Sequence, residues 1–140
     1  MRRRGRECAL QILYQMDLNG DLCADKVLTS ENKNDAMNAY WSSFEAVKPQ
    51  TREFSERLVQ GVLAELLQLD KAISENSKNW KISRMDKVDL NLLRMAAFEI
   101  LYCPDIPKAA SINEALEIAK RFSEHDAASF INGILDNIGS

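Results

Sequence analysis

Apolar residues recur at helical spacing along almost the whole chain. Near the beginning they occupy the positions that one face of a helix presents, and residues 19–21 (Asn-Gly-Asp) are expected to end that helix. Residues 19–33 are then predicted to form a polar connection. The first apolar face consists of Cys8, Ala9, Ile12, Leu13 and Met16. The sequence contains no alternating strand pattern of useful length and no internal repeat.

The same periodicity predicts a second amphipathic helix over residues 34–47. It is expected to stop at Lys48-Pro49, because the residue before a proline disfavours helical backbone. A third helix is expected to take Thr51 as its capping residue and to continue through residue 73, with a kink or restart near Asp70. Residues 76–79 (Asn-Ser-Lys-Asn) are predicted to break the pattern.

The last part of the chain predicts three more helices. The first of them is expected to be capped by Ser83 or Asp86 and to end at residues 103–107, which contain two prolines. Residues 111–114 (Ser-Ile-Asn-Glu) match a capping box, in which the first and last side chains each bind a free backbone N–H. Residues 123–126 repeat this capping pattern before a final helix. The whole pattern predicts six or seven helices and an all-α fold in one compact domain.

Length and composition are those of an ordinary globular protein. The chain has 140 residues, of which 46% are hydrophobic and 28% charged, enough for one domain with a hydrophobic core. It has no apolar run of about 18 residues, so no membrane span is expected. Its cationic start is not followed by an export core, because polar residues interrupt the next segment. Three widely spaced cysteines fit neither a disulfide framework nor a metal site, which favours a cytoplasmic location.

The distribution of charge is more informative than the net value of −3. Residues 1–6 contain four arginines and no acid, which leaves 14 basic residues to 21 acidic ones in the remainder. An acidic body with a cationic head favours one focused binding site for a polyanion over general adhesion to nucleic acid. Because cations at the start of a helix oppose its dipole, either a partner compensates these arginines or they fray into solvent.

The residue types that catalysis and metal binding require are scarce. His125 is the one histidine in the chain, and it is expected to be a surface residue at the start of the last helix. The sequence has neither G-x-x-x-x-G-K nor G-x-G-x-x-G, the loops that hold phosphates of nucleotides. Glu114 and Glu117 share a helix face that is more typical of solvation than of acid–base chemistry. We therefore expect no catalytic residue, no metal and no cofactor.

Three segments of the chain resemble the NusB family. Residues 2–14 begin R-R-R-G-R-E-C-A, like the arginine-rich opening and first helix of that family. Residues 88–100 resemble its central helix, and residues 112–136 contain I-N-E-A followed by F-I-N-G-I-L-D. The likeness covers nearly the whole chain and is weakest over residues 19–50. Ser129 departs from the pattern, since many relatives carry a lysine there.

The resemblance implies an all-helical fold of about seven helices in two small bundles, over residues 1–78 and 79–140. It also implies a non-enzymatic transcription antitermination factor that binds single-stranded boxA RNA of ribosomal RNA leader transcripts. NusB proteins do so with NusE, a small-subunit ribosomal protein, and join RNA polymerase with other Nus factors. The outcome is processive transcription and maturation of ribosomal RNA. Family members can self-associate by covering the RNA face, so the resemblance does not decide between a monomer and a homodimer.

The opening arginines are the first candidates for RNA contact. Four phosphate contacts would give log K a slope of about −3 against log salt, and the planar guanidinium also stacks on unpaired bases. The alternative interpretation is a solvated, disordered cationic tail. The residues concerned are Arg2, Arg3, Arg4 and Arg6.

Further candidates follow from the family pattern around the junction of the last two helices. Phe122 and Phe130 would stack on bases, or else pack in the core. Asp126 would accept from a base edge, or else cap the last helix, and Lys120 would belong to the basic rim or be solvated. Gly133 is interpreted as a packing position, since a mid-helix glycine costs about 1 kcal/mol relative to alanine.

Two residues match the partner-binding face of the family. Tyr14 is expected to be half-buried, and Asp89 to be an acid in the first turn of its helix. Two other functions remain alternatives: the NusB-like module of a ribosomal RNA methyltransferase, which requires a downstream α/β domain, and a helical scaffold that binds only proteins.

Overall fold

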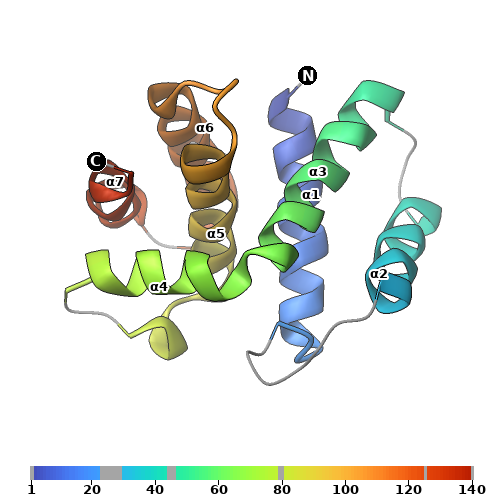
Figure 1. The fold of residues 1–140 in the computed structure, drawn as a ribbon, viewed down its shortest axis with the longest axis horizontal. Helices are drawn as coiled ribbons and strands as arrows, with labels where there is room; N and C mark the ends of the chain where they lie inside the picture. The colour runs from blue at the N-terminus through green and yellow to red at the C-terminus, as the bar shows by residue number, and fades with distance from the viewer. Residues whose placement is uncertain (1, 23–29, 44–46, 79–80, 125, 140) are drawn as a thin grey trace.

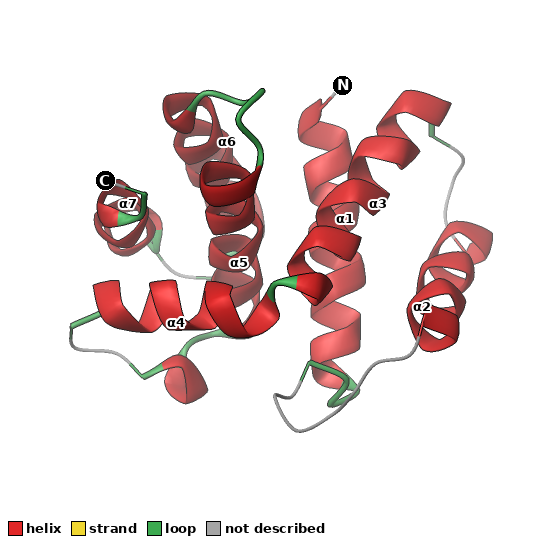
Figure 2. Ribbon diagram, viewed as in Figure 1, coloured by secondary structure: helices red, strands yellow, loops and turns green. Residues whose placement is uncertain are grey.

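Helices make up all the regular structure in the described parts of the chain. The computed structural model describes residues 2–22, 30–43, 47–78, 81–124 and 126–139 (Figures 1 and 2). Within them lie seven α-helices and one short 3₁₀ helix, which confirms the predicted all-α fold. They are α1 (Arg2–Leu18), α2 (Ser30–Ser43), α3 (Pro49–Ala64), α4 (Leu66–Asn76), η1 (Ile82–Arg84), α5 (Lys87–Tyr102), α6 (Lys108–Phe122) and α7 (Ala128–Asn137).

Helix α5 is the centre of the fold. It packs against α1, α3, α4, α6 and α7, and every residue from Asp89 to Ala97 is buried. On one side α1 packs along α3, with α2 beside α1, while α6 and α7 lie on the other side of α5 (Figure 1). Helix α4 crosses below and packs mainly on α5 and α7. The boundary between residues 78 and 79 stays a prediction.

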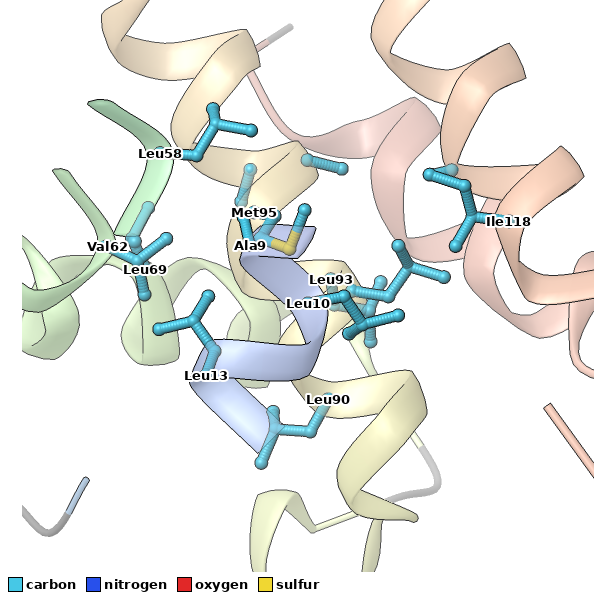
Figure 3. Close-up of a cluster of buried hydrophobic side chains, with 14 of the residues drawn as sticks. Ala9, Leu10, Leu13, Leu58, Val62, Leu69, Leu90, Leu93, Met95 and Ile118 are labelled. Carbon is cyan, nitrogen blue, oxygen red and sulfur yellow. The ribbon is translucent and has the colours of Figure 1, made fainter. Parts of the chain in front are cut away.

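The hydrophobic core draws side chains from helices far apart in the sequence. Figure 3 shows the cluster around Leu10 and Leu13 of α1, where α3, α4, α5 and α6 contribute Leu58, Leu69, Leu93 and Ile118. These side chains are at most 2% exposed. Full burial of each large aliphatic side chain contributes about 1.5–3 kcal/mol. The first helix is therefore part of the main core rather than a peripheral arm.

A buried polar network joins the end of α1 to α4 and α5. The Arg94 guanidinium donates to both carboxylate oxygens of Asp70 at 2.8 and 3.0 Å. It also donates to Asp17 at 3.3 Å, and Asn91 donates to the same Asp17 oxygen at 2.9 Å. Lys87 completes the arrangement with an ion pair to Asp17 at 3.2 Å. These pairs compensate a guanidinium that is only 4% exposed.

Helix ends follow the predicted caps only in part. Asp86 does cap α5, because its carboxylate accepts from the backbone N–H groups of Val88 and Asp89. The cap predicted at Thr51 is wrong: α3 begins at Pro49, and Thr51 is buried inside the helix. A proline suits the first turn of a helix, since its missing N–H has no partner there anyway.

The two capping patterns around α6 and α7 are also wrong. Helix α6 begins at Lys108, so Ser111 lies one turn inside it and its hydroxyl donates to Glu99. Helix α7 begins after Ala127 without any side-chain cap, and His125 lies outside the described residues. A local capping pattern does not show that the serine hydroxyl donates to a residue of another helix, as Ser111 does to Glu99.

Two other boundaries differ from the sequence prediction. The third helix breaks at Glu65, between α3 and α4, rather than near Asp70. Asp70 lies inside α4, where Arg94 binds it. The second helix covers Ser30–Ser43 instead of residues 34–47, of which 44–46 lie outside the described residues.

Gly133 is not the packing position that its place in a helix indicated. It is exposed, and a Cβ atom added to it would meet nothing within 4 Å.

We expect Gly133→Ala to raise the free energy of unfolding by about 0.5–1 kcal/mol, because alanine restricts the unfolded chain and favours helix. Urea denaturation measures the change. Gly20→Ala is the control, since Gly20 has equally open space but a φ of +78° and should lose stability. A loss at Gly133 would contradict the prediction.

Among the described residues, no helix is long and apolar enough to cross a membrane. The same residues contain no group of three or more histidine, cysteine or acidic side chains placed to hold a metal ion.

Candidate nucleic-acid interface

The first two turns of α1 lie against α6, and charged side chains connect them. Arg3 donates from Nε and a terminal nitrogen to the two carboxylate oxygens of Glu114, at 3.0 and 2.8 Å. Glu7 accepts from Arg121 of α6 at 2.8 Å and from Arg4 at 3.4 Å. We call this surface the α1/α6 seam, defined by Arg3, Arg4, Glu7, Glu114 and Arg121. The arginine-rich opening thus lies beside the helix that leads to the last junction.

Arg6 is not part of the exposed cationic surface. Its side chain is 6% exposed, and it donates to both carboxylate oxygens of Glu99 at 2.8 and 2.7 Å. Ser111 donates to one of these oxygens at 2.8 Å. A buried ion pair needs such additional hydrogen bonds, because desolvation of the charges is costly. Arg6 therefore connects α1 to α5 and α6, and it is not positioned to contact a phosphate.

Arg2 points toward α3 instead of α6. Its guanidinium lies 4.9 Å from the centre of the Phe54 ring and 3.8 Å from Asp105. Successive helical residues turn by about 100° around the axis, so four nearly consecutive arginines cannot share one face. Arg2 instead borders a shallow cavity of about 740 Å³ along α3, which Arg57 and Gln60 also line.

Acidic side chains of α1 itself, α5 and α6 compensate the cationic start of α1. Within the described residues, Arg3, Arg4 and Arg6 each contact a glutamate. The hydrogen bond from Arg3 lowers the pKa of Glu114, and Glu114 raises the pKa of Arg3. Because the Arg3 side chain is 53% exposed, this pair contributes little to folding. Arg3 and Arg4 are thus held in place and remain exposed to solvent, whereas Arg6 is buried.

Of the predicted residues of the last junction, the structure places Phe122 directly beside the seam. Phe122 follows Arg121, whose guanidinium lies 5.2 Å from the centre of its ring. Both Phe122 and Phe130 are half-buried and pack against the core, so each combines core contact with an accessible part. Lys120 and Asp126 are exposed and line one cavity of about 350 Å³. Lys120 also pairs with Glu117 at 3.3 Å.

Sequence reasoning missed the contributions of Glu7 and Glu114 and the pairing of Arg121 with α1. A partial signal was present, because Glu7 lies three residues after Arg4, the spacing at which side chains meet on a helix. The contact with Arg121 had no such signal, since it joins residues 114 positions apart.

The two residues predicted for partner contact lie at the other end of α1. Tyr14 is half-buried and Asp89 is 2% exposed. Each is within one turn of the network in which Asp17 binds Lys87 and Asn91, so both belong to the region where α1 ends and α5 begins. Tyr14 is eleven residues from Arg3, or about 17 Å along the helix.

Comparisons with known proteins agree with this architecture. The model of the NusB family matches residues 3–140. The transcription antitermination protein NusB of Geobacter sp. (strain M21) is 46% identical over 139 residues, covering 99% of this chain and 94% of that protein. A crystal form of T. maritima NusB superposes with a TM-score of 0.81 at 30% identity, covering 99% of this chain and 90% of the other.

A further solved structure shares the fold. It is a complex described as antitermination factors NusB and NusE with dsRNA, and it matches with a TM-score of 0.81 at 21% identity, over 99% of this chain and 95% of that one. The helical architecture and the sequence similarity over nearly the whole chain therefore agree. The chain belongs to the NusB family, whose members are transcription antitermination factors and not enzymes.

Proposed function

We propose that this chain binds boxA RNA of nascent ribosomal RNA leader transcripts, together with NusE, in the cytoplasm. In this role it joins RNA polymerase with other Nus factors and supports processive transcription and maturation of ribosomal RNA. The observation that carries the proposal is the exposed cationic seam, whose Arg121 lies over the ring of the half-buried Phe122. Family membership and the RNA-containing structural neighbour support it.

The seam offers the chemistry that a single-stranded polyanion requires. A guanidinium has five N–H donors, and Arg3 uses only its Nε and one terminal nitrogen on Glu114. The remaining donors of Arg3, with those of Arg4 and Arg121, can bind phosphate oxygens. In this proposal the accessible parts of Phe122 and Phe130 stack on bases, at about 1–3 kcal/mol per base.

We assign the recognition of particular RNA bases to the junction between α6 and α7. Asp126 caps no helix backbone and is exposed, so its carboxylate can accept from a base amino group. Lys120 adds a cation to the same cavity. Arg2 is exposed on the α3 side of α1, outside the seam, and Arg6 holds α1 in place. We therefore assign phosphate contact to Arg2, Arg3 and Arg4, and a structural role to Arg6.

NusE is assigned to the end of the molecule opposite the opening arginines. Tyr14 is half-buried there and retains accessible surface for a partner. Asp89 is 2% exposed, so we assign it to the support of this surface. Self-association that covers the seam would compete with RNA.

A salt titration tests the RNA-binding function. We expect the parent protein to prefer boxA RNA over a scrambled strand, more strongly with NusE present. In Arg3→Ala/Arg4→Ala, loss of two phosphate contacts should make the slope of log K against log salt less negative by about 1.4. Fluorescence anisotropy measures the affinity, and light scattering excludes a change of oligomeric state.

Lys48→Ala/Arg52→Ala is the matched control, because it removes two exposed cations near the start of α3, neither of which lines the cavity beside Arg2. It should keep the parental slope. Equal binding by the parent and the Arg3/Arg4 variant would contradict the assigned interface. A parent that binds NusE but no RNA would favour the protein-only scaffold.

A further inference from the structure

Glu7 is the more deeply buried of the two acids in the α1/α6 seam, and its described partners are arginines at the surface. The Glu7 side chain is 5% exposed, whereas those of Arg4 and Arg121 are 46% and 67% exposed. One carboxylate oxygen accepts from Arg121 at 2.8 Å, and the other accepts from Arg4 at 3.4 Å. A single buried carboxylate thus holds two exposed cations, one from each helix.

The stability of the fold gives little reason for an acid at this position. Removing a carboxylate from water is costly, and a well-packed apolar side chain in place of a buried ion pair is often neutral or stabilising. The two partners of Glu7 recover little of that cost, because ion pairs with exposed arginines contribute little to folding. The pair of Arg6 and Glu99 differs, since both of its members are buried. What the Glu7 carboxylate does fix is the position of two guanidinium groups on the surface.

These two guanidinium groups lie close enough together to meet one short stretch of a strand. Because the two oxygens of a carboxylate are about 2 Å apart, the nitrogen atoms that they bind are at most about 8 Å apart. Each arginine uses one terminal nitrogen on Glu7, which leaves the other N–H donors of Arg4 and Arg121 for phosphate oxygens. Without the carboxylate, like charge would drive the two guanidinium groups apart.

Arg121 also connects the seam to the junction between α6 and α7. Its guanidinium lies 5.2 Å from the centre of the Phe122 ring, the ring to which base stacking is assigned above. Glu7 holds the same guanidinium from α1. An arginine side chain has many rotamers in solution, and ordering it at two points before RNA arrives lowers the entropic cost of binding.

We propose that Glu7 is a positioning residue for RNA, which holds Arg4 and Arg121 in the arrangement that binds phosphates although its own charge repels them. The proposal rests on the RNA-binding function proposed above. The two effects of Glu7 have opposite signs. By charge alone, removing an acid beside a polyanion strengthens binding, whereas losing the positioning of two arginines weakens it. Positioning prevails, because the buried carboxylate is already compensated by the two cations that it holds.

Glu7→Gln tests the proposal, because glutamine keeps the size of the side chain and removes its charge. We expect the affinity for boxA RNA to fall about 2- to 10-fold, the range expected when one or two arginine side chains must be ordered on binding. The slope of log K against log salt should keep its parental value, since the arginines remain and still contact phosphates. Fluorescence anisotropy at several salt concentrations measures both quantities, and circular dichroism checks that the helices are intact.

Glu117→Gln is the matched control for the loss of a negative charge near the seam. Glu117 is an exposed acid of α6 whose charge acts on Arg3, but among the described residues its side chain pairs with Lys120 and not with an arginine. The affinity of this variant for RNA should equal or exceed that of the parent. A loss as large as that of Glu7→Gln would overturn the proposal, because removal of any nearby acid would then suffice.

A double-mutant cycle shows whether Glu7 acts through the two arginines. Arg4→Ala/Arg121→Ala changes only exposed side chains, and it should make the salt slope less negative by about 1.4. In that background, Glu7→Gln should cause no further loss of affinity. An equal loss in both backgrounds would overturn the proposal, since Glu7 would then act through the fold, and so would parental or higher affinity in Glu7→Gln alone. These results leave RNA binding by the parent intact, whereas a parent that binds no boxA RNA defeats the proposed function as well.

Discussion

Glu99→Ala should lower the free energy of unfolding by about 3–5 kcal/mol, the typical cost of breaking a buried ion pair by removing one partner. The substitution leaves the guanidinium of Arg6 buried without the carboxylate that accepts two of its hydrogen bonds. Ser111 loses its acceptor as well. Glu114 is 3.6 Å from Arg6 and compensates only part of the loss. Urea denaturation of the purified protein measures the effect.

The matched control for this prediction is Arg3→Ala. It also breaks a two-pronged arginine–glutamate pair between α1 and another helix, but the Arg3 side chain is 53% exposed. Exposed pairs contribute about 0–1 kcal/mol, so Arg3→Ala should be nearly neutral for stability. Similar stability losses in the two variants would show that burial does not separate the two pairs, and the structural role of Arg6 would have to be abandoned.

Gly61→Ala should destabilise the protein by about 2 kcal/mol, because α3 and α5 approach closely at this position. A Cβ atom on Gly61 would lie 2.1 Å from Cζ of Phe98 and within 2.5 Å of two other ring atoms. The half-buried ring would have to leave its place, and overpacking of this kind costs about 1–3 kcal/mol. This steric cost exceeds the gain of about 1 kcal/mol from replacing a helical glycine.

A double-mutant cycle with Phe98→Ala isolates the steric cause. Without the ring, Gly61→Ala should be neutral or stabilising by up to about 1 kcal/mol, since only the helix preference remains. An equal stability loss in both backgrounds would refute the contact as the cause. The comparison with Gly133→Ala is instructive, because that glycine has open space and the opposite sign is expected.

The opening arginines show that the sequence predicts where charge lies along the chain but not how each charged side chain is buried or paired. Their sequence predicts a cationic cluster, and the cluster is indeed next to α6. It did not predict that Arg6 is buried, that Arg2 turns toward Phe54, or that only Arg3 and Arg4 border the seam directly.

Predictions of helix boundaries were wrong where a capping side chain binds a residue far away in the sequence, or where two positions offered the same local pattern. The capping box at residues 111–114 is a valid local pattern, but α6 starts earlier and its serine binds Glu99. The predicted cap at Asp86 was right, because its carboxylate accepts from backbone N–H groups only two and three residues away. Gly133 and Gly61 are both helical glycines, and sequence alone does not distinguish the exposed one from the one under an aromatic ring.

The sequence by itself determined the helical architecture, the membership of the NusB family and the end of the chain where positive charge gathers. These depend on periodicity over a few residues and on motifs read along the chain. Only the tertiary structure decided which charges are free to bind a ligand. The partners of Arg6 and Arg3 lie 93 and 111 residues away, and folding brings them within hydrogen-bonding distance. Burial then separates an arginine that holds the fold together from one that can meet a phosphate.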